Sequence, residues 1–152
     1  RADEPCEAFL LEAVSDFQVT IPELGTIKAP APPIVILTSN RTREVHDALK
    51  RRCLYTWIGF PEQSREVEIV RSRLPHVAES LAAQVVSAVN KLRAMELEKL
   101  PGVAETIDWT ESLDALGVQN LTPEAALDTL GAVVKDRDDL EYTAKSVQDV
   151  VA

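Results

Sequence analysis

A run of four aliphatic residues, at positions 34–37, constrains the fold of this chain more than any other feature of the sequence. Three of the four are β-branched and two prolines precede them, which is typical of a short strand buried on both faces of a parallel sheet. Thr38, Ser39 and Asn40 follow, and their small polar side chains would lie at the carboxyl edge of that sheet. Ligands of open α/β sheets bind at this edge. We therefore expect a strand at residues 34–38 and a ligand-facing side chain at Asn40.

A short helix and two adjacent arginines are expected next along the chain. Residues 44–51 predict the helix, and Arg51 and Arg52 stand at its end, about ten residues after Asn40. A guanidinium group stays charged at physiological pH and can bind two phosphate oxygens at once. A polar strand end and an arginine pair therefore point to phosphate chemistry. Two structural alternatives stay open: Asn40 could cap the turn that follows it, and the arginines could interact only with the carbonyl end of their helix.

The other N-terminal segments predict one more helix, a hairpin and a second strand. Residues 3–15 have acidic residues and a proline in their first turn, which favours the start of a helix. Residues 17–28 alternate apolar and polar side chains around a Pro-Glu-Leu-Gly turn, a pattern typical of a hairpin. Residues 54–58 predict the second strand. We expect residues 1–61 to form one α/β domain.

From residue 62 onward the sequence predicts helices only. Apolar residues recur at helical spacing, and a Pro-Gly pair at 101–102 interrupts the pattern. Gly117 has the position of a glycine just after a helix end, and Thr122 precedes a proline and a glutamate, as an N-cap residue does. We therefore expect residues 62–152 to fold as a small helical bundle. Its helices are expected at residues 62–74, 77–96, 104–116, 123–134 and 138–151.

Composition and charge limit the classes of function. The 152 residues include 25 acidic residues and 16 lysines or arginines, which gives a net charge of −9. This charge argues against a nucleic-acid partner, because phosphate neutralisation needs a positive surface; only the basic run at residues 41–52 favours one. No apolar run approaches the roughly 20 residues that span a membrane, so no membrane partner is expected. Cys6 and Cys53 are too few for a disulfide framework, which favours a reduced, cytoplasmic protein. His46 and His76 do not have the spacing of metal ligands, so no metal site is expected.

The order and spacing of these motifs resemble the AAA+ ATPases, and most closely the MoxR group with its CoxD-like branch, which is linked to the maturation of metalloenzymes. The resemblance covers nearly the whole chain and begins partway through the family's ATPase core. Residues 1–5 (Arg-Ala-Asp-Glu-Pro) resemble the segment that follows the Walker B acids of the family, and residues 17–28 resemble the hairpin before sensor 1. Residues 37–40 (Leu-Thr-Ser-Asn) resemble the sensor 1 strand, and residues 47–52 (Asp-Ala-Leu-Lys-Arg-Arg) resemble the arginine-finger helix. Residues 62–152 resemble the helical lid. The implied fold class is α/β: part of the parallel sheet of a P-loop NTPase, with a hairpin, followed by an all-α lid.

The resemblance implies roles for three residues of the N-terminal domain. Asn40 would be the sensor 1 residue and would hold the attacking water or a γ-phosphate oxygen with its amide. Arg51 or Arg52 would be the arginine finger, which acts on ATP bound to the neighbouring subunit of a homo-oligomeric ring, expected to be a hexamer. Counting back from residues 59–61 favours Arg51, whereas the position just before Cys53 favours Arg52, and both stay open.

The intact parent is expected to use ATP and Mg²⁺ and to couple hydrolysis to the remodelling or maturation of a partner protein, such as a metalloenzyme. This chain lacks the Gly-x-x-x-x-Gly-Lys-Ser/Thr loop and the Walker B strand with its acids, so it has no residues to hold the phosphates or magnesium. We expect the chain alone to be inactive and to bind no cofactor tightly. Thr106 stands where many MoxR relatives have the sensor 2 arginine and is our candidate for cofactor contact in the lid. The alternative function is a non-catalytic helical protein-interaction module on an AAA+-derived scaffold.

Overall fold

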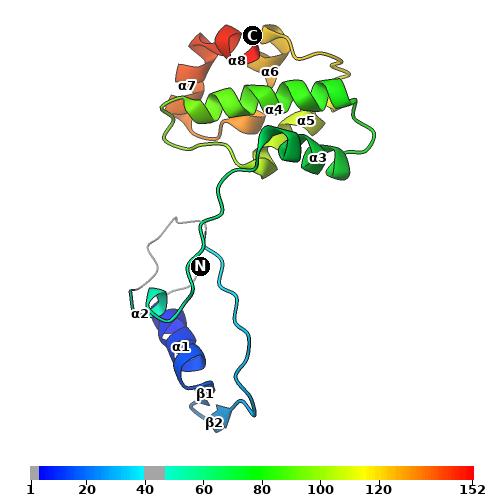
Figure 1. Cartoon of the computed structure of the whole chain (residues 1–152). Coiled ribbons are helices and arrows are strands. Elements are labelled where there is room, and N and C mark those ends of the chain that lie inside the picture. Colours follow the sequence, from blue (N-terminus) through cyan, green and yellow to red (C-terminus); the bar gives the residue numbers. More distant parts are fainter. Residues whose placement is uncertain (1–3, 40–46) are drawn as a thin grey trace. The chain divides into compact units, whose positions relative to one another are not determined.

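The computed structural model describes residues 4–39 and 47–152 and divides the chain into two compact units, Arg1–Ile58 and Gly59–Ala152. We call them the N-terminal unit and the helical unit, and Figure 1 shows the elements of each. The division falls just before the boundary after residue 61 that the sequence predicts.

The N-terminal unit has a helix and a hairpin where the sequence predicts them. The two strands pair antiparallel, with Val19 opposite Ile27. Gly25 begins the second strand with a φ of 78°, a left-handed conformation that glycine adopts without steric cost. The predictions of a helix at residues 3–15 and a hairpin at residues 17–28 are thus confirmed. The elements of this unit are α1 (Glu4–Ser15), β1 (Gln18–Ile21), β2 (Gly25–Lys28) and α2 (Asp47–Lys50).

A carboxylate of α1 fastens the hairpin to that helix. Glu12 accepts hydrogen bonds from the Thr20 hydroxyl at 2.6 Å, from the Thr20 backbone N–H at 3.3 Å and from the Gln18 side-chain amide at 3.2 Å. These hydrogen bonds, and above all the one from the Thr20 hydroxyl, hold the pKa of Glu12 below its ordinary value. Because β2 is exposed along its whole length, polar contacts rather than buried apolar surface position this hairpin.

The expected parallel sheet is not formed by the described residues. Residues 32–39 and 54–58 have no regular secondary structure, and the β1–β2 hairpin is the only sheet in the described part of the chain. Ile34 is 94% exposed and Ile58 is 91% exposed. Strands of a parallel sheet need neighbouring strands at their edges and helices on both faces. Among the described residues these two segments have no neighbouring strand, and neither forms the strand predicted at residues 34–38 or 54–58.

The helical unit follows the predicted pattern of helices closely. The last predicted helix is divided in two, because Ser146, with φ −115° and ψ 16°, ends one helix and precedes the next. Gly117 has the predicted left-handed conformation, with φ 73°. The Thr122 hydroxyl accepts a hydrogen bond from the Ala125 N–H at 3.2 Å and so caps its helix as predicted. The helices are α3 (Gln63–Arg73), α4 (Glu79–Ala94), α5 (Val103–Ala115), α6 (Pro123–Val133), α7 (Arg137–Lys145) and α8 (Val147–Val151).

Helix α4 supplies the largest share of the apolar core of the helical unit. It packs against α3, α5 and α8 (Figure 1). On α5, Trp109 is fully buried, and its indole N–H donates to the Thr129 hydroxyl of α6 at 2.7 Å. Each large apolar side chain that is removed from water stabilises such a core by about 1.5–3 kcal/mol. The buried residues of α4 are Leu81, Ala82, Val85, Val86, Ala88, Val89 and Leu92.

Candidate functional site

Helix α2 presents the two candidate arginines at its C-terminal end. Leu49 is the buried residue of this short helix, which packs against α1. The helical hydrogen bonding continues just past the helix, because the Arg51 N–H donates to the Asp47 carbonyl at 3.0 Å. Both arginine side chains are exposed. The end of α2 therefore holds two cations that a partner can reach.

The two arginines differ in what they contact. Nη1 of Arg52 donates to the Ala48 carbonyl at 2.9 Å, so Arg52 caps the end of its own helix. Arg51 makes no side-chain hydrogen bond or ion pair with the residues that the structure describes. The structural alternative, in which the cation interacts with the helix end, therefore applies to Arg52. No described residue accepts a hydrogen bond from the five N–H donors of the Arg51 guanidinium.

The predicted sensor residue, Asn40, lies outside the described residues. The first part of the predicted helix, residues 44–46, lies outside them as well. The geometry that would relate Asn40 to Arg51 is thus not described, and the role of Asn40 stays a prediction from the sequence.

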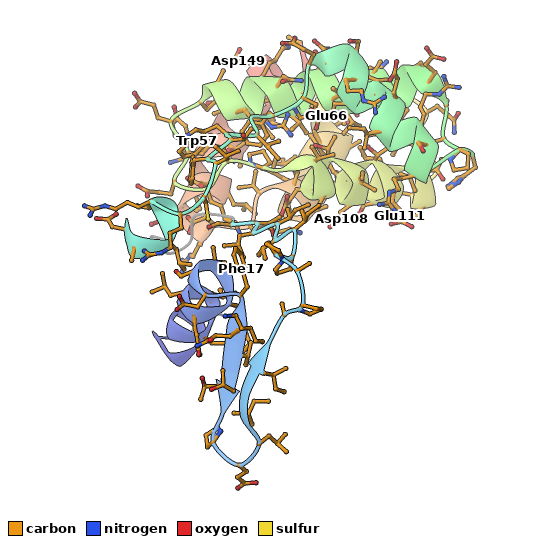
Figure 2. All side chains as sticks on the ribbon, turned by 60° about the horizontal axis from the view of Figure 1, so that its bottom comes forward. Phe17, Trp57, Glu66, Asp108, Glu111 and Asp149 are labelled. Atoms are coloured by element: carbon orange, nitrogen blue, oxygen red, sulfur yellow. The ribbon has the colours of Figure 1, made fainter. Side chains whose placement is uncertain are left out.

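Two exposed apolar segments, residues 34–37 and residues 54–58, flank the arginine helix along the chain. The second contains two aromatic residues, Tyr55 and Trp57, whose rings meet edge to face with their centroids 5.5 Å apart. Trp57 is 61% exposed, and Figure 2 shows its place on the extended chain. Contiguous apolar surface of this kind marks interaction sites in soluble proteins. The residues predicted to form a buried sheet therefore present apolar surface to the solvent.

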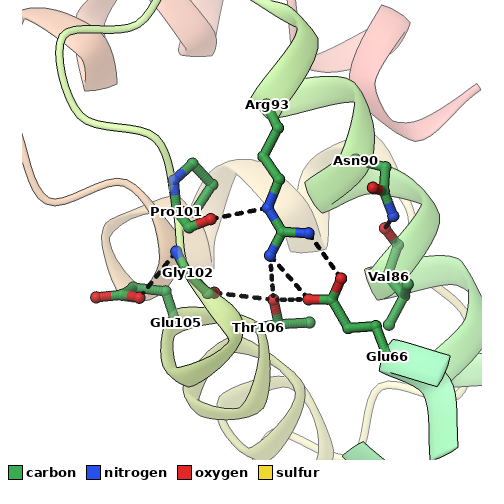
Figure 3. Close-up of polar contacts among 8 residues, drawn as sticks. All are labelled: Glu66, Val86, Asn90, Arg93, Pro101, Gly102, Glu105 and Thr106. Atoms are coloured by element: carbon green, nitrogen blue, oxygen red, sulfur yellow. Dashed lines mark hydrogen bonds and ion pairs between the residues drawn. The ribbon is translucent and has the colours of Figure 1, made fainter. Parts of the chain in front are cut away.

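Thr106, the predicted cofactor contact of the lid, is fully buried in a polar network (Figure 3). Its hydroxyl lies 2.7 Å from Oε1 of Glu66 and 3.1 Å from the Gly102 carbonyl. Glu66 also accepts two hydrogen bonds from Arg93, from Nη1 to Oε2 at 2.6 Å and from Nη2 to Oε1 at 2.8 Å. Nε of Arg93 donates to the Pro101 carbonyl at 2.8 Å.

This network joins α3, α4 and α5. The side chain of Glu66 is 0% exposed and that of Arg93 is 6% exposed, so both charges are removed from water. Their two parallel hydrogen bonds supply the pairing that buried charges require. Thr106 consequently offers no exposed group to a nucleotide in this conformation. Its role as a cofactor contact stays a prediction, and it would require the network to open.

Sequence reasoning did not single out Glu66 or Arg93. Both are charged residues of amphipathic helices, where a solvent-facing position is the default. One signal exists in the sequence: Glu66 stands one turn before Val70, and Arg93 directly follows Leu92, so both border apolar positions. Only the packing of α3 against α4 brings the two charges face to face.

The rest of the described surface shows no prepared ligand site. No group of three or more His, Cys, Asp or Glu side chains among the described residues could hold a metal ion. A shallow groove of about 360 Å³ near the end of α4 is lined by Lys91, Met95, Tyr142 and Asp149, among others. Lys91 donates to the Asp149 carbonyl at 3.3 Å, so its ammonium group is already in use. On α5, Asp108 and Glu111 lie on the exposed side of the helix (Figure 2).

Comparisons of the chain with protein-family models, with curated proteins and with solved structures find no match. None of the described helices has both the length and the apolarity needed to cross a membrane. The resemblance to the AAA+ ATPases therefore rests on the sequence motifs alone.

Proposed function

We propose that this chain is part of a MoxR-type AAA+ ATPase, namely the end of its ATPase core together with its helical lid. The whole protein would couple ATP hydrolysis to the remodelling or maturation of a partner protein. One observation supports this most: a short helix with two exposed arginines at its end is flanked by two apolar segments and followed by a separate helical unit. The AAA+ family that the sequence resembles has its elements in the same order: the sensor 1 strand, the finger helix, the next strand and the lid. A finger also needs an exposed guanidinium, because it acts on another subunit.

Arg51 is the better candidate for the finger. The guanidinium of Arg52 is engaged with the Ala48 carbonyl, whereas that of Arg51 has no partner among the described residues. An arginine supplied from a neighbouring subunit stabilises the charge on a transferred phosphoryl group, an effect worth about 10³–10⁵ in rate in other NTPases. Asn40 would orient the attacking water through its amide.

ATP is the proposed substrate and Mg²⁺ the proposed cofactor, but the residues present do not fit a site for either. The sequence lacks the phosphate-binding loop, and the described residues include no cluster of metal-ligating side chains. We therefore assign to this chain no phosphate-binding loop and no magnesium ligand, and Arg51 and Asn40 would act on ATP that other residues hold. The proposal requires that other residues of the parent protein hold both.

The encoding DNA provides the first test. A Gly-x-x-x-x-Gly-Lys-Ser/Thr motif is expected within about 100 residues upstream of Arg1 in the same reading frame. An initiation codon close to Arg1, with no such motif before it, would contradict the proposal and favour an interaction module.

Turnover by the ring-forming parent provides the second test. Arg51→Ala is expected to lower kcat at least about 100-fold with little change in the Kd for ATP, because a finger acts in the transition state. Arg52→Ala is the matched control, since it removes an adjacent exposed charge that caps α2. We expect a loss of less than about tenfold from this control. Normal phosphate release by both single variants and by the double variant excludes an arginine finger in α2, whereas a large loss confined to Arg52→Ala moves the finger to that residue.

The burial of Thr106 favours a second function, a non-catalytic helical interaction module on an AAA+-derived scaffold. A lid that senses nucleotide presents a side chain to it, whereas the Thr106 hydroxyl is enclosed and bonded to Glu66. The two functions predict different partner binding. A module binds its partner equally well with and without ATP, whereas the ATPase binds its partner with an affinity that depends on the bound nucleotide.

A further inference from the structure

The helical unit begins with Gly59, Phe60 and Pro61. Phe60 lies against Arg93 of the buried ion pair. The Cζ atom of Arg93 is 4.1 Å from the centroid of the Phe60 ring, well within the range of a cation–π interaction. Pro101 and Glu66 occupy the edges of the guanidinium with hydrogen bonds. The Phe60 ring covers one flat face of the guanidinium, a face that makes no hydrogen bonds.

We propose that the stack of Phe60 on Arg93 is a clamp that holds Phe60 and Pro61 to the helical unit, so that the connection between the two units bends before Phe60 and not at the start of α3. The backbone beyond the clamp supports this. Pro61 follows Phe60 directly, which restricts Phe60 to extended conformations. Glu62, the N-cap residue of α3, is also extended, with φ −58° and ψ 149°. From Phe60 into α3 the chain is therefore stiff as well as held.

The chain on the other side of the clamp is irregular and exposed. Residues 54–58 have no regular secondary structure, and Leu54 and Ile58 are almost fully exposed. At Gly59, an added Cβ atom would meet no atom within 4 Å beyond Gly59 and its two chain neighbours. The restraint on the backbone thus changes sharply between Gly59 and Phe60.

The clamp also couples Phe60 and Pro61 to the ion pair of Glu66 and Arg93. With Phe60 in place, the Arg93 side chain is only 6% exposed. If Phe60 moves away from Arg93, water reaches the guanidinium of Arg93 and weakens its attraction to Glu66, because the local dielectric constant rises. A pull on Phe60 and Pro61 is therefore transmitted to α3, α4 and α5, which the network joins. This coupling does not depend on the proposed ATPase function.

Backbone ¹⁵N relaxation of the full chain tests the clamp, because it yields an order parameter for each amide. We expect values below about 0.6 for residues 54–59 and near 0.85 for residues 60 and 62. Phe60→Leu keeps apolar bulk but removes the aromatic face, and should lower the values at residues 60 and 62 below about 0.6. Phe60→Tyr keeps the face and should retain the order of the wild type. Gly59→Ala alters the neighbouring residue without touching the stack and should leave both values unchanged.

A melting experiment separates the clamp from ordinary packing. In a Trp57→Phe background, the fluorescence of Trp109 reports the unfolding of the helical unit alone. Phe60→Leu should shift this Tm by no more than about 8 °C, although it changes the local order parameters greatly. Wild-type order at residues 60 and 62 in the Phe60→Leu variant would overturn the proposal. So would an equal loss of order in Phe60→Tyr, or an unfolded helical unit in both variants.

Discussion

At the scale of single residues, the Glu66–Arg93 pair shows how this protein accommodates buried charge. The carboxylate receives hydrogen bonds from Arg93 and from Thr106, and the guanidinium is also bonded to the Pro101 carbonyl. Such a pair adds little stability compared with a well-packed apolar pair, but the loss of one partner leaves an uncompensated charge. The network therefore constrains the relative positions of α3, α4 and α5 more than it stabilises the fold.

A double-mutant cycle on this pair tests that interpretation. Glu66→Leu and Arg93→Met should each lower the free energy of unfolding by about 3–5 kcal/mol, whereas the double variant should lose much less than the sum. Urea unfolding followed through Trp109 fluorescence gives these values. The pair of Arg65 and Glu68 is the matched control on the same helix: its N–O distance is 2.7 Å, but its side chains are 68% and 66% exposed. Arg65→Met should cost less than about 1 kcal/mol. Equal costs at the two sites would contradict the interpretation.

Glu12 predicts a pH dependence of the hairpin. Because folding lowers the pKa of this carboxyl, its contribution is fully present above the ordinary glutamate pKa and is lost as the pH falls through the lowered value. A ¹³C titration of the Glu12 carboxyl should therefore have a midpoint below that of an unfolded glutamate. Thr20→Val removes the hydroxyl that contributes most and keeps a β-branched side chain, so it should raise the midpoint. An unchanged midpoint in this variant would show that Thr20 does not hold the carboxylate.

At the scale of elements, helices and strands of this chain differ in what they need in order to form. A helix makes its hydrogen bonds within its own sequence, and the caps predicted at Thr122 and Gly117 are present. A strand needs a partner. Residues 34–37 and 54–58 have strand-forming composition, yet in the proposed AAA+ core each would pair with a strand that leads to the phosphate loop, and this chain does not contain it.

These two segments predict self-association of the isolated chain. Exposed apolar segments recruit other chains, so the mass from light scattering should exceed that of a monomer and rise with concentration. Ile36→Lys should lower the association, because it places a charge within the segment. Leu116→Lys is the control, since it removes an exposed apolar side chain of the helical unit and should have no effect. The prediction would be refuted by a monomeric chain in which both segments are strongly protected from hydrogen exchange.

At the scale of the whole molecule, nearly all buried apolar side chains among those described belong to one unit. The core of the helical unit consists only of its own residues, whereas Leu49 is the one buried apolar residue among the described side chains of the N-terminal unit. A domain with so little buried surface has almost no stability of its own. The helical unit should therefore be the stable part of the chain.

Truncation tests this expectation. Residues 59–152 alone should unfold in one cooperative transition, with a Tm within about 4 °C of that of the same unit in the full chain. Residues 1–58 alone should show no cooperative transition, as monitored by Trp57 fluorescence. A large drop in Tm on removal of residues 1–58 would mean that the N-terminal unit contributes to the stability of the helical unit.

The sequence by itself determined the elements whose information is local. The helix at residues 3–15, the hairpin at residues 17–28 and the helical bundle after residue 62 follow from periodicity, turn residues and caps that act over a few positions. The exposed arginine pair at the end of a short helix is local in the same sense. These features also carry the resemblance on which the proposed function rests.

Only the tertiary structure decided which groups meet across elements. It left residues 34–38 and 54–58 without strand partners among the described residues, because sheet hydrogen bonds join segments that are distant in the sequence. It enclosed Thr106 between Glu66 and the Gly102 carbonyl, and it placed the guanidinium of Arg93 beneath Phe60. No local pattern encodes these contacts, since the burial of a charge depends on the helix that packs over it.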